Sequence, residues 1–105
     1  MHDLTIRNAT IMDGSGKARF QGDVAVDGDK ITAVEPAGTL APGKEDIDAN
    51  GLVVTPGFVD IHTHYDGQVC WDKEVTPSSW HGVTTVVMGN CGVGFAPVHP
   101  GSEDA

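Results

Sequence analysis

Short alternations of apolar and polar residues fill the first half of the chain. Alternation of this kind, interrupted by Gly, Asn and Asp, is typical of short β-strands joined by tight turns. The pattern predicts six strands, at residues 4–7, 10–12, 23–27, 30–35, 46–48 and 52–55. Asn8-Ala9 is predicted to connect the first two strands, and Asp27-Gly28-Asp29 to form the turn of a hairpin. An all-β region is therefore expected, as in half of a sandwich or of a small barrel.

The second half of the chain has a different pattern. Residues 58–61 are mostly apolar and predict a buried strand, and the β-branched run at 83–88 predicts another. Between them, Thr76 as N-cap, Pro77 at the first helical position and Gly82 beyond the end predict a short helix. Strand, helix and strand imply two parallel strands joined by a right-handed crossover. Because two parallel strands do not make a stable sheet, we expect another chain or a longer protein to complete it.

Composition narrows the classes of function. The chain has 105 residues and a formal net charge of −9, which argues against nucleic acid or an anionic membrane as a partner. Its apolar runs are too short to span a bilayer. Two cysteines, Cys70 and Cys91, are too few for a secreted disulfide framework, and the start of the chain does not resemble a signal peptide. A cytoplasmic protein is therefore predicted, with Cys70 as a structural residue and the 94–105 stretch as a loop.

His62 and His64 are the strongest candidates for chemistry. They are spaced i and i+2 at the end of the predicted strand 58–61, so Asp60, His62 and His64 are expected to share one face. Two imidazoles in this position can converge on one metal ion, and the carboxyl ends of parallel strands are where α/β folds build active sites. Two histidines satisfied by ordinary hydrogen bonds are the alternative. Asp60 is expected either to orient an imidazole or to cap a backbone group.

Cys91 ends the second predicted parallel strand, within Gly89-Asn90-Cys91-Gly92. The crossover makes the two strands neighbours, so the thiol can reach His62 and His64, and the flanking glycines allow close backbone approach. A thiolate is a strong zinc ligand, whereas a buried, inert cysteine is the alternative reading.

Four further residues are candidates for contact with substrate or with the metal ligands: Asp60, Tyr65, Asp66 and Asn90. Two other histidines, His81 and His99, are predicted to be surface residues.

The motif Pro-Gly-Phe-Val-Asp-Ile-His-Thr-His at 56–64, after a β region, resembles the opening of the amidohydrolase superfamily. Thr76-Pro77 and the run from Gly82 to Gly92 resemble the N-acyl-D-amino-acid deacylase (D-aminoacylase) branch more specifically. The resemblance covers nearly the whole chain but only the amino-terminal part of the family's full-length proteins.

This resemblance implies a mainly β fragment, with 1–55 as a portion of a small β-sandwich and 56–105 as the first βαβ unit of an incomplete (β/α)₈ barrel. It implies that His62, His64 and Cys91 are metal ligands for zinc or another divalent metal, with one or two ions in the complete protein. The implied reaction is hydrolysis of a small-molecule amide, an N-acyl-D-amino acid, by metal-activated water.

The resemblance also implies what this chain does not contain. The family's further histidines and its general acid/base aspartate come from later strands, so no catalytic proton-transfer residue is expected here and the chain alone is expected to be inactive. Tyr65-Asp66 departs from the acidic pair of D-aminoacylases, which leaves a hydantoinase-like cyclic amide hydrolase open. A non-catalytic β module is the remaining alternative. The unpaired apolar strands predict self-association.

Overall fold

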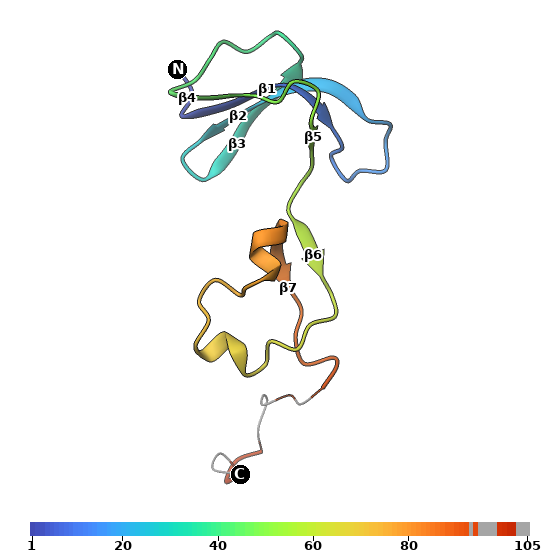
Figure 1. Cartoon of the computed structure of the whole chain (residues 1–105), viewed down its shortest axis with the longest axis vertical. Helices are drawn as coiled ribbons and strands as arrows, with labels where there is room; N and C mark the ends of the chain where they lie inside the picture. The colour runs from blue at the N-terminus through green and yellow to red at the C-terminus, as the bar shows by residue number, and fades with distance from the viewer. Residues whose placement is uncertain (93, 95–98, 103–105) are drawn as a thin grey trace. The chain divides into compact units, whose positions relative to one another are not determined.

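The computed structural model describes residues 1–92, 94 and 99–102. The chain forms two compact units, Met1–Pro56 and Gly57–Ala105. The first contains β1 (Leu4–Ile11), β2 (Phe20–Asp27), β3 (Lys30–Pro36), β4 (Glu45–Asp48) and β5 (Val53–Val54). The second contains β6 (Phe58–Asp60), the 3₁₀ helices η1 (Gln68–Cys70) and η2 (Ser78–His81), and β7 (Val83–Val86) (Figure 1). Most of the loop predicted for 94–105 lies outside the described residues.

The first unit is one five-stranded sheet with the order β3-β2-β1-β4, and β5 also pairs with β1. β1, β2 and β3 are antiparallel neighbours, and the β2–β3 hairpin turns at Gly28, as the sequence predicted. β4 and β5 both run parallel to β1, β4 along its first half and β5 along its second. The second layer that a sandwich requires is not found among the described residues, so the sandwich stays a prediction.

β1 corrects one prediction. Residues 4–7 and 10–12 were predicted to be separate strands joined at Asn8-Ala9, but they form one continuous strand with an irregularity between Ile6 and Ala9. Asn8 takes a left-handed conformation at φ 57°, which adds local twist without ending the strand. The side chain of Asn8 donates to Asp48 Oδ1 (3.0 Å), and its N–H donates to Asp23 Oδ1 (2.9 Å). These bonds stabilise a bulge that the local pattern resembled as a turn.

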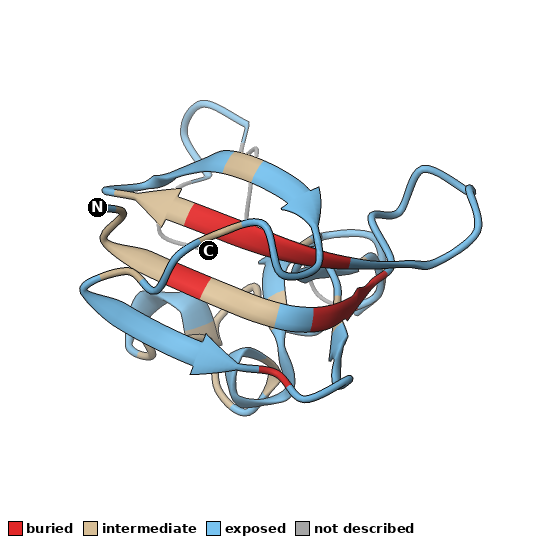
Figure 2. Ribbon diagram, turned by 90° about the horizontal axis from the view of Figure 1, so that it is seen from above, coloured by how far each residue is buried: buried red, intermediate tan, exposed pale blue. Residues whose placement is uncertain are grey.

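The core of the first unit is small and lies under β1 and β2 (Figure 2). Ala9, Ile11, Val24 and Ala49 form the buried cluster. Asp23 is also fully buried, and its carboxylate accepts backbone N–H groups from Asn8, Thr39 and Leu40. Burial raises the pKa of Asp23, but these backbone donors outweigh it and hold the pKa below its usual value. The charged carboxylate thereby anchors the chain after β3.

The second unit confirms the two parallel strands and corrects the helix. β6 pairs with β7 in parallel. The predicted helix is a single 3₁₀ turn that begins at Ser78, with Pro77 rather than Thr76 at the N-cap position. Thr76 is not free to cap it, because its N–H and its hydroxyl both donate to Asp72 Oδ2. Gly82 ends the turn in the left-handed conformation, as predicted.

The strands of the second unit were predicted to be buried, and in this chain they are not. Phe58 and Val59 are each 58% exposed and Ile61 is 67% exposed. η2 lies against β7, but two strands and two short turns supply too little surface to cover apolar side chains on both faces. Among the described residues, no helix has the length and apolar character needed to cross a membrane.

Candidate metal centre

The site begins where β6 stops. The Oδ1 atom of Asp60 accepts the backbone N–H of His62 (3.1 Å), a turn that ends the strand. His62 and His64 therefore lie in the loop after β6 and not on the strand itself, which corrects the prediction that they share a strand face with Asp60. Of the two roles predicted for Asp60, the structure shows the cap on a backbone group.

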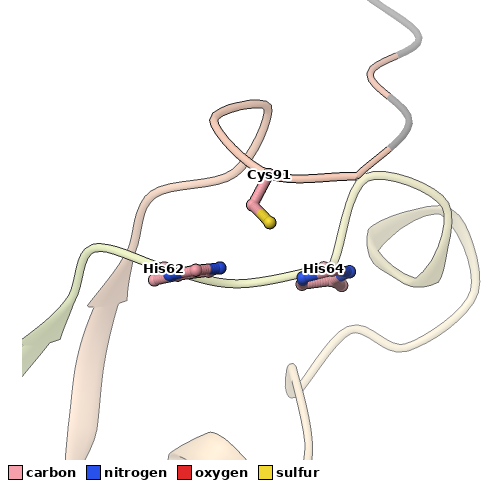
Figure 3. Close-up of side chains that lie close together, drawn as sticks. All are labelled: His62, His64 and Cys91. Atoms are coloured by element: carbon pink, nitrogen blue, oxygen red, sulfur yellow. The ribbon is translucent and has the colours of Figure 1, made fainter.

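The loop nevertheless brings the two imidazoles together. The rings of His62 and His64 are nearly parallel, at an interplanar angle of 9°, and their centroids are 5.9 Å apart. Both residues are exposed, and Cys91 is partly buried. One potential ligand atom from each of these three residues lies within 4.8 Å of the others, and Figure 3 shows the Cys91 sulfur directed toward the two rings.

Glycine allows this approach. Gly92 follows Cys91 with φ +90°, and a Cβ atom built at this position would lie 3.1 Å from Nδ1 of His64. A larger residue would push against the imidazole, so the loop can pass this close to His64 because no side chain stands at residue 92. The prediction that glycines flanking Cys91 permit close backbone approach agrees with this contact.

The donor set fits a zinc-type ion. Bond lengths near 2.0–2.1 Å to nitrogen and 2.3 Å to sulfur place tetrahedral ligand atoms about 3.3–3.6 Å apart. The observed limit of 4.8 Å is about 1 Å wider, a difference that small side-chain rotations can close. Two imidazoles and one thiolate leave at least one of four positions to another ligand, so these residues alone make a partial centre.

The other predicted site residues have structural partners. Tyr65 is buried, and its hydroxyl forms hydrogen bonds with Ser78 Oγ (2.6 Å) and with the carbonyl of Thr76 (3.4 Å). The side-chain amide of Asn90 donates to the carbonyl oxygen of Ile61 (2.7 Å).

Asp66 is partly buried and lies beside the glycine loop. Its Oδ1 atom is 3.7 Å from the position that a Cβ atom would take at Gly89. Its carboxylate has no hydrogen-bond partner among the described residues, which leaves it available to a ligand.

Cys70, predicted to be structural, is an exposed free thiol in η1, and Cys91 is also free. His81 and His99 are exposed, as predicted.

Thr63 is the residue that sequence reasoning missed. It is only 5% exposed, and its hydroxyl donates to the carbonyl of Val87 (2.8 Å). The signal was its position: a small hydroxyl side chain between two exposed histidines must point the opposite way, into the unit.

Comparison with known proteins places these features in a family. The sequence pattern of the amidohydrolase family matches residues 45–102, more than half of the chain. N-acyl-D-aspartate deacylase of Alcaligenes xylosoxydans xylosoxydans is 47% identical over 96 residues, which is 91% of this chain and 19% of that protein. The chain thus spans about a fifth of the length of the curated relatives it matches.

Solved structures agree. A D-aminoacylase structure described for its binuclear metal centre superposes with a TM-score of 0.81 at 39% identity, covering 99% of this chain and 23% of that one. N-acyl-D-glutamate deacylase from Bordetella bronchiseptica, complexed with zinc and a phosphonate inhibitor, gives 0.79 at 38% identity, covering 95% and 21%. On the sequence match, the motif at 56–64 and these structural likenesses, the chain belongs to the amidohydrolase family.

Proposed function

We propose that this chain is the amino-terminal part of a metal-dependent amidohydrolase that cleaves the C–N amide bond of N-acyl-D-amino acids. The observation that carries the proposal is the convergence of His62, His64 and Cys91, with ligand atoms within 4.8 Å of one another. The names of the matched relatives, deacylases of N-acyl-D-aspartate and N-acyl-D-glutamate, support the choice of substrate class.

Each residue has a defined part. His62 and His64 hold the metal through neutral imidazole nitrogens, and Cys91 holds it through a deprotonated thiolate. The bound metal, zinc by the printed description of the deacylase structure, lowers the pKa of water and polarises a carbonyl. Asp66, with an unpartnered carboxylate beside the glycine loop, is available to accept a hydrogen bond from the substrate.

The centre needs residues from outside this chain. Three ligands leave a zinc-type centre incomplete, and a family member requires a carboxylate for proton transfer as well. We infer that these groups belong to the part of such a protein that this chain does not span, and that the chain alone does not turn over substrate.

The same reasoning extends to the architecture. We infer that the unit before Gly57 is a portion of a β-sandwich and that β6, η2 and β7 begin a (β/α)₈ barrel. The exposed apolar side chains of β6 support this inference, because they are the type that barrel strands bury. Until they are covered, they favour self-association. The two free cysteines agree with the reducing cytoplasm that we propose as the location.

Alkylation of the two thiols tests the metal centre with an internal control. We expect Zn²⁺ to protect Cys91 from iodoacetamide while the exposed thiol of Cys70 reacts at the same rate with and without metal, as followed by mass spectrometry of tryptic peptides. His62→Ala should abolish the protection of Cys91, and His81→Ala, which alters an exposed histidine outside the cluster, should not. Equal reactivity of Cys91 with and without Zn²⁺ would leave the non-catalytic β module as the better reading.

Substrate class is tested separately. We expect the 105-residue chain to hydrolyse neither N-acyl-D-amino acids nor hydantoins. A longer protein that contains this chain should hydrolyse N-acyl-D-amino acids when supplied with zinc. Preference for hydantoins in that protein would reassign it to the hydantoinase-like alternative.

A further inference from the structure

Two side-chain hydrogen bonds continue the connection between β6 and β7 beyond the point where their backbones stop pairing. The last paired residues are Asp60 and Val86, and the N–H of Val87 donates to the carbonyl of Asp60 (2.8 Å). Past this point, the carbonyl of Val87 accepts the hydroxyl of Thr63, and the carbonyl of Ile61 accepts the side-chain amide of Asn90. The two bonds run in opposite directions between the two segments.

These bonds lie next to the candidate ligands along the chain. Thr63 stands between His62 and His64, and Asn90 immediately precedes Cys91. The hydrogen bond of Asp60 to His62 joins residues of one segment, so it cannot set the distance to Cys91. The bonds of Thr63 and Asn90 cross between the segments and therefore can.

We propose that Thr63 and Asn90 are positioning residues that hold the histidine loop and the cysteine loop at metal-binding separation. This inference rests on the proposed metal centre. Ligand atoms within 4.8 Å of one another need to close by only about 1 Å around a zinc-type ion. Without the two bonds, each loop would have to be ordered on binding, and that entropy cost would weaken the metal affinity.

The test measures metal binding and not turnover. Co²⁺ is titrated into the chain, and binding is followed by the thiolate-to-Co²⁺ charge-transfer band, which reports the Cys91 sulfur. We expect Thr63→Val and Asn90→Ala each to weaken Co²⁺ binding by about tenfold or more, the range seen when groups that orient metal ligands are removed. Thr63→Ser keeps the hydroxyl and should restore binding. The double variant should fall short of the product of the single effects, because both bonds fix the same separation.

Thr85→Val is the matched control. It removes the hydroxyl of an exposed threonine on β7 that makes no side-chain hydrogen bond to any described residue, so its Co²⁺ affinity should equal that of the unaltered chain. Amide NMR spectra establish whether each variant keeps the fold of the second unit.

The outcomes separate this inference from the proposal beneath it. If the unaltered chain gives no thiolate band with Co²⁺, the metal centre itself fails, and the inference with it. If the unaltered chain binds and the Thr63→Val and Asn90→Ala variants bind equally well, the positioning role is overturned while the metal centre stands. Loss of the second unit's NMR signals in both variants would also overturn it, because the bonds would then support the fold and not the ligand geometry.

Discussion

The buried carboxylate of Asp23 allows a stability prediction that can be worked through from the structure. Its Oδ1 accepts the N–H of Asn8 at 2.9 Å, and its Oδ2 accepts those of Thr39 and Leu40 at 3.0 and 3.1 Å. Asp23→Asn replaces one oxygen with an NH₂ group, so in either orientation at least one backbone donor faces another donor. An orphaned donor costs about 1–3 kcal/mol, and the bonds that remain lose their charge assistance. We expect the first unit to lose about 2–4 kcal/mol of unfolding free energy.

Urea denaturation measures this loss, and the chain provides its own reference signal. Both tryptophans, Trp71 and Trp80, lie in the second unit, so their fluorescence follows that unit while NMR signals of β1–β3 follow the first. Asp29→Asn, in the exposed β2–β3 turn, makes the same change in charge and should leave the midpoint unchanged. An Asp23→Asn midpoint equal to that of the Asp29→Asn control would refute the reasoning.

The pH dependence gives a second check on Asp23. Its pKa is lowered in the folded chain, so its stabilisation is complete above the unfolded value of about 3.9 and is lost as the pH falls through the lower folded value. The unaltered chain should therefore lose stability on acidification more steeply than the Asp23→Asn variant. Parallel pH profiles would contradict this assignment.

Two further predictions concern other parts of the chain. Hydrogen bonds from the Gln68 side chain, and from the hydroxyl and N–H of Thr76, lower the pKa of Asp72 to about 2, so amide exchange at Thr76 should accelerate only as the pH falls from about 4 toward that value. Exchange that is unchanged down to pH 2 would count against this role. Gly22→Ala would place a Cβ atom 2.6 Å from Cδ1 of Ile11, so it should destabilise the first unit by about 1–3 kcal/mol in urea. Gly16→Ala meets no atom within 4 Å and tests backbone strain alone, because Gly16 has φ +82°; equal losses in the two variants would mean that steric contact is not the cause.

Local pattern was sufficient for most of the strands and for the residues of the site. Alternation placed β2, β3 and β4, and Gly28 marked the hairpin turn, because these features depend on neighbours in sequence. The pattern misread Asn8 as a break, since the bulge at Asn8 is stabilised by Asp23 and Asp48, which are distant in sequence. Sequence-local reasoning cannot see such bonds.

The same limit applies to the site. Spacing and topology brought His62, His64 and Cys91 together, because parallel strands end at one edge of a sheet. The Asx-type turn at Asp60, the short 3₁₀ form of η2 and the hydrogen bond of Thr63 were not predicted. Each depends on which side-chain oxygen reaches which backbone group, and that is decided only after the chain has folded.

The central place of β1 has a consequence for synthesis of the chain. β1 pairs with the early strand β2, but also with β4 and β5, which end at Asp48 and Val54. At translation rates of about 5–20 residues per second, the edge of β1 stays unoccupied for roughly 2–10 seconds before β5 is made. During that interval a nascent chain exposes an open strand edge to its neighbours on the polysome. A ribosome-associated chaperone that shields this edge should therefore improve the yield of folded chain more than one acting after release.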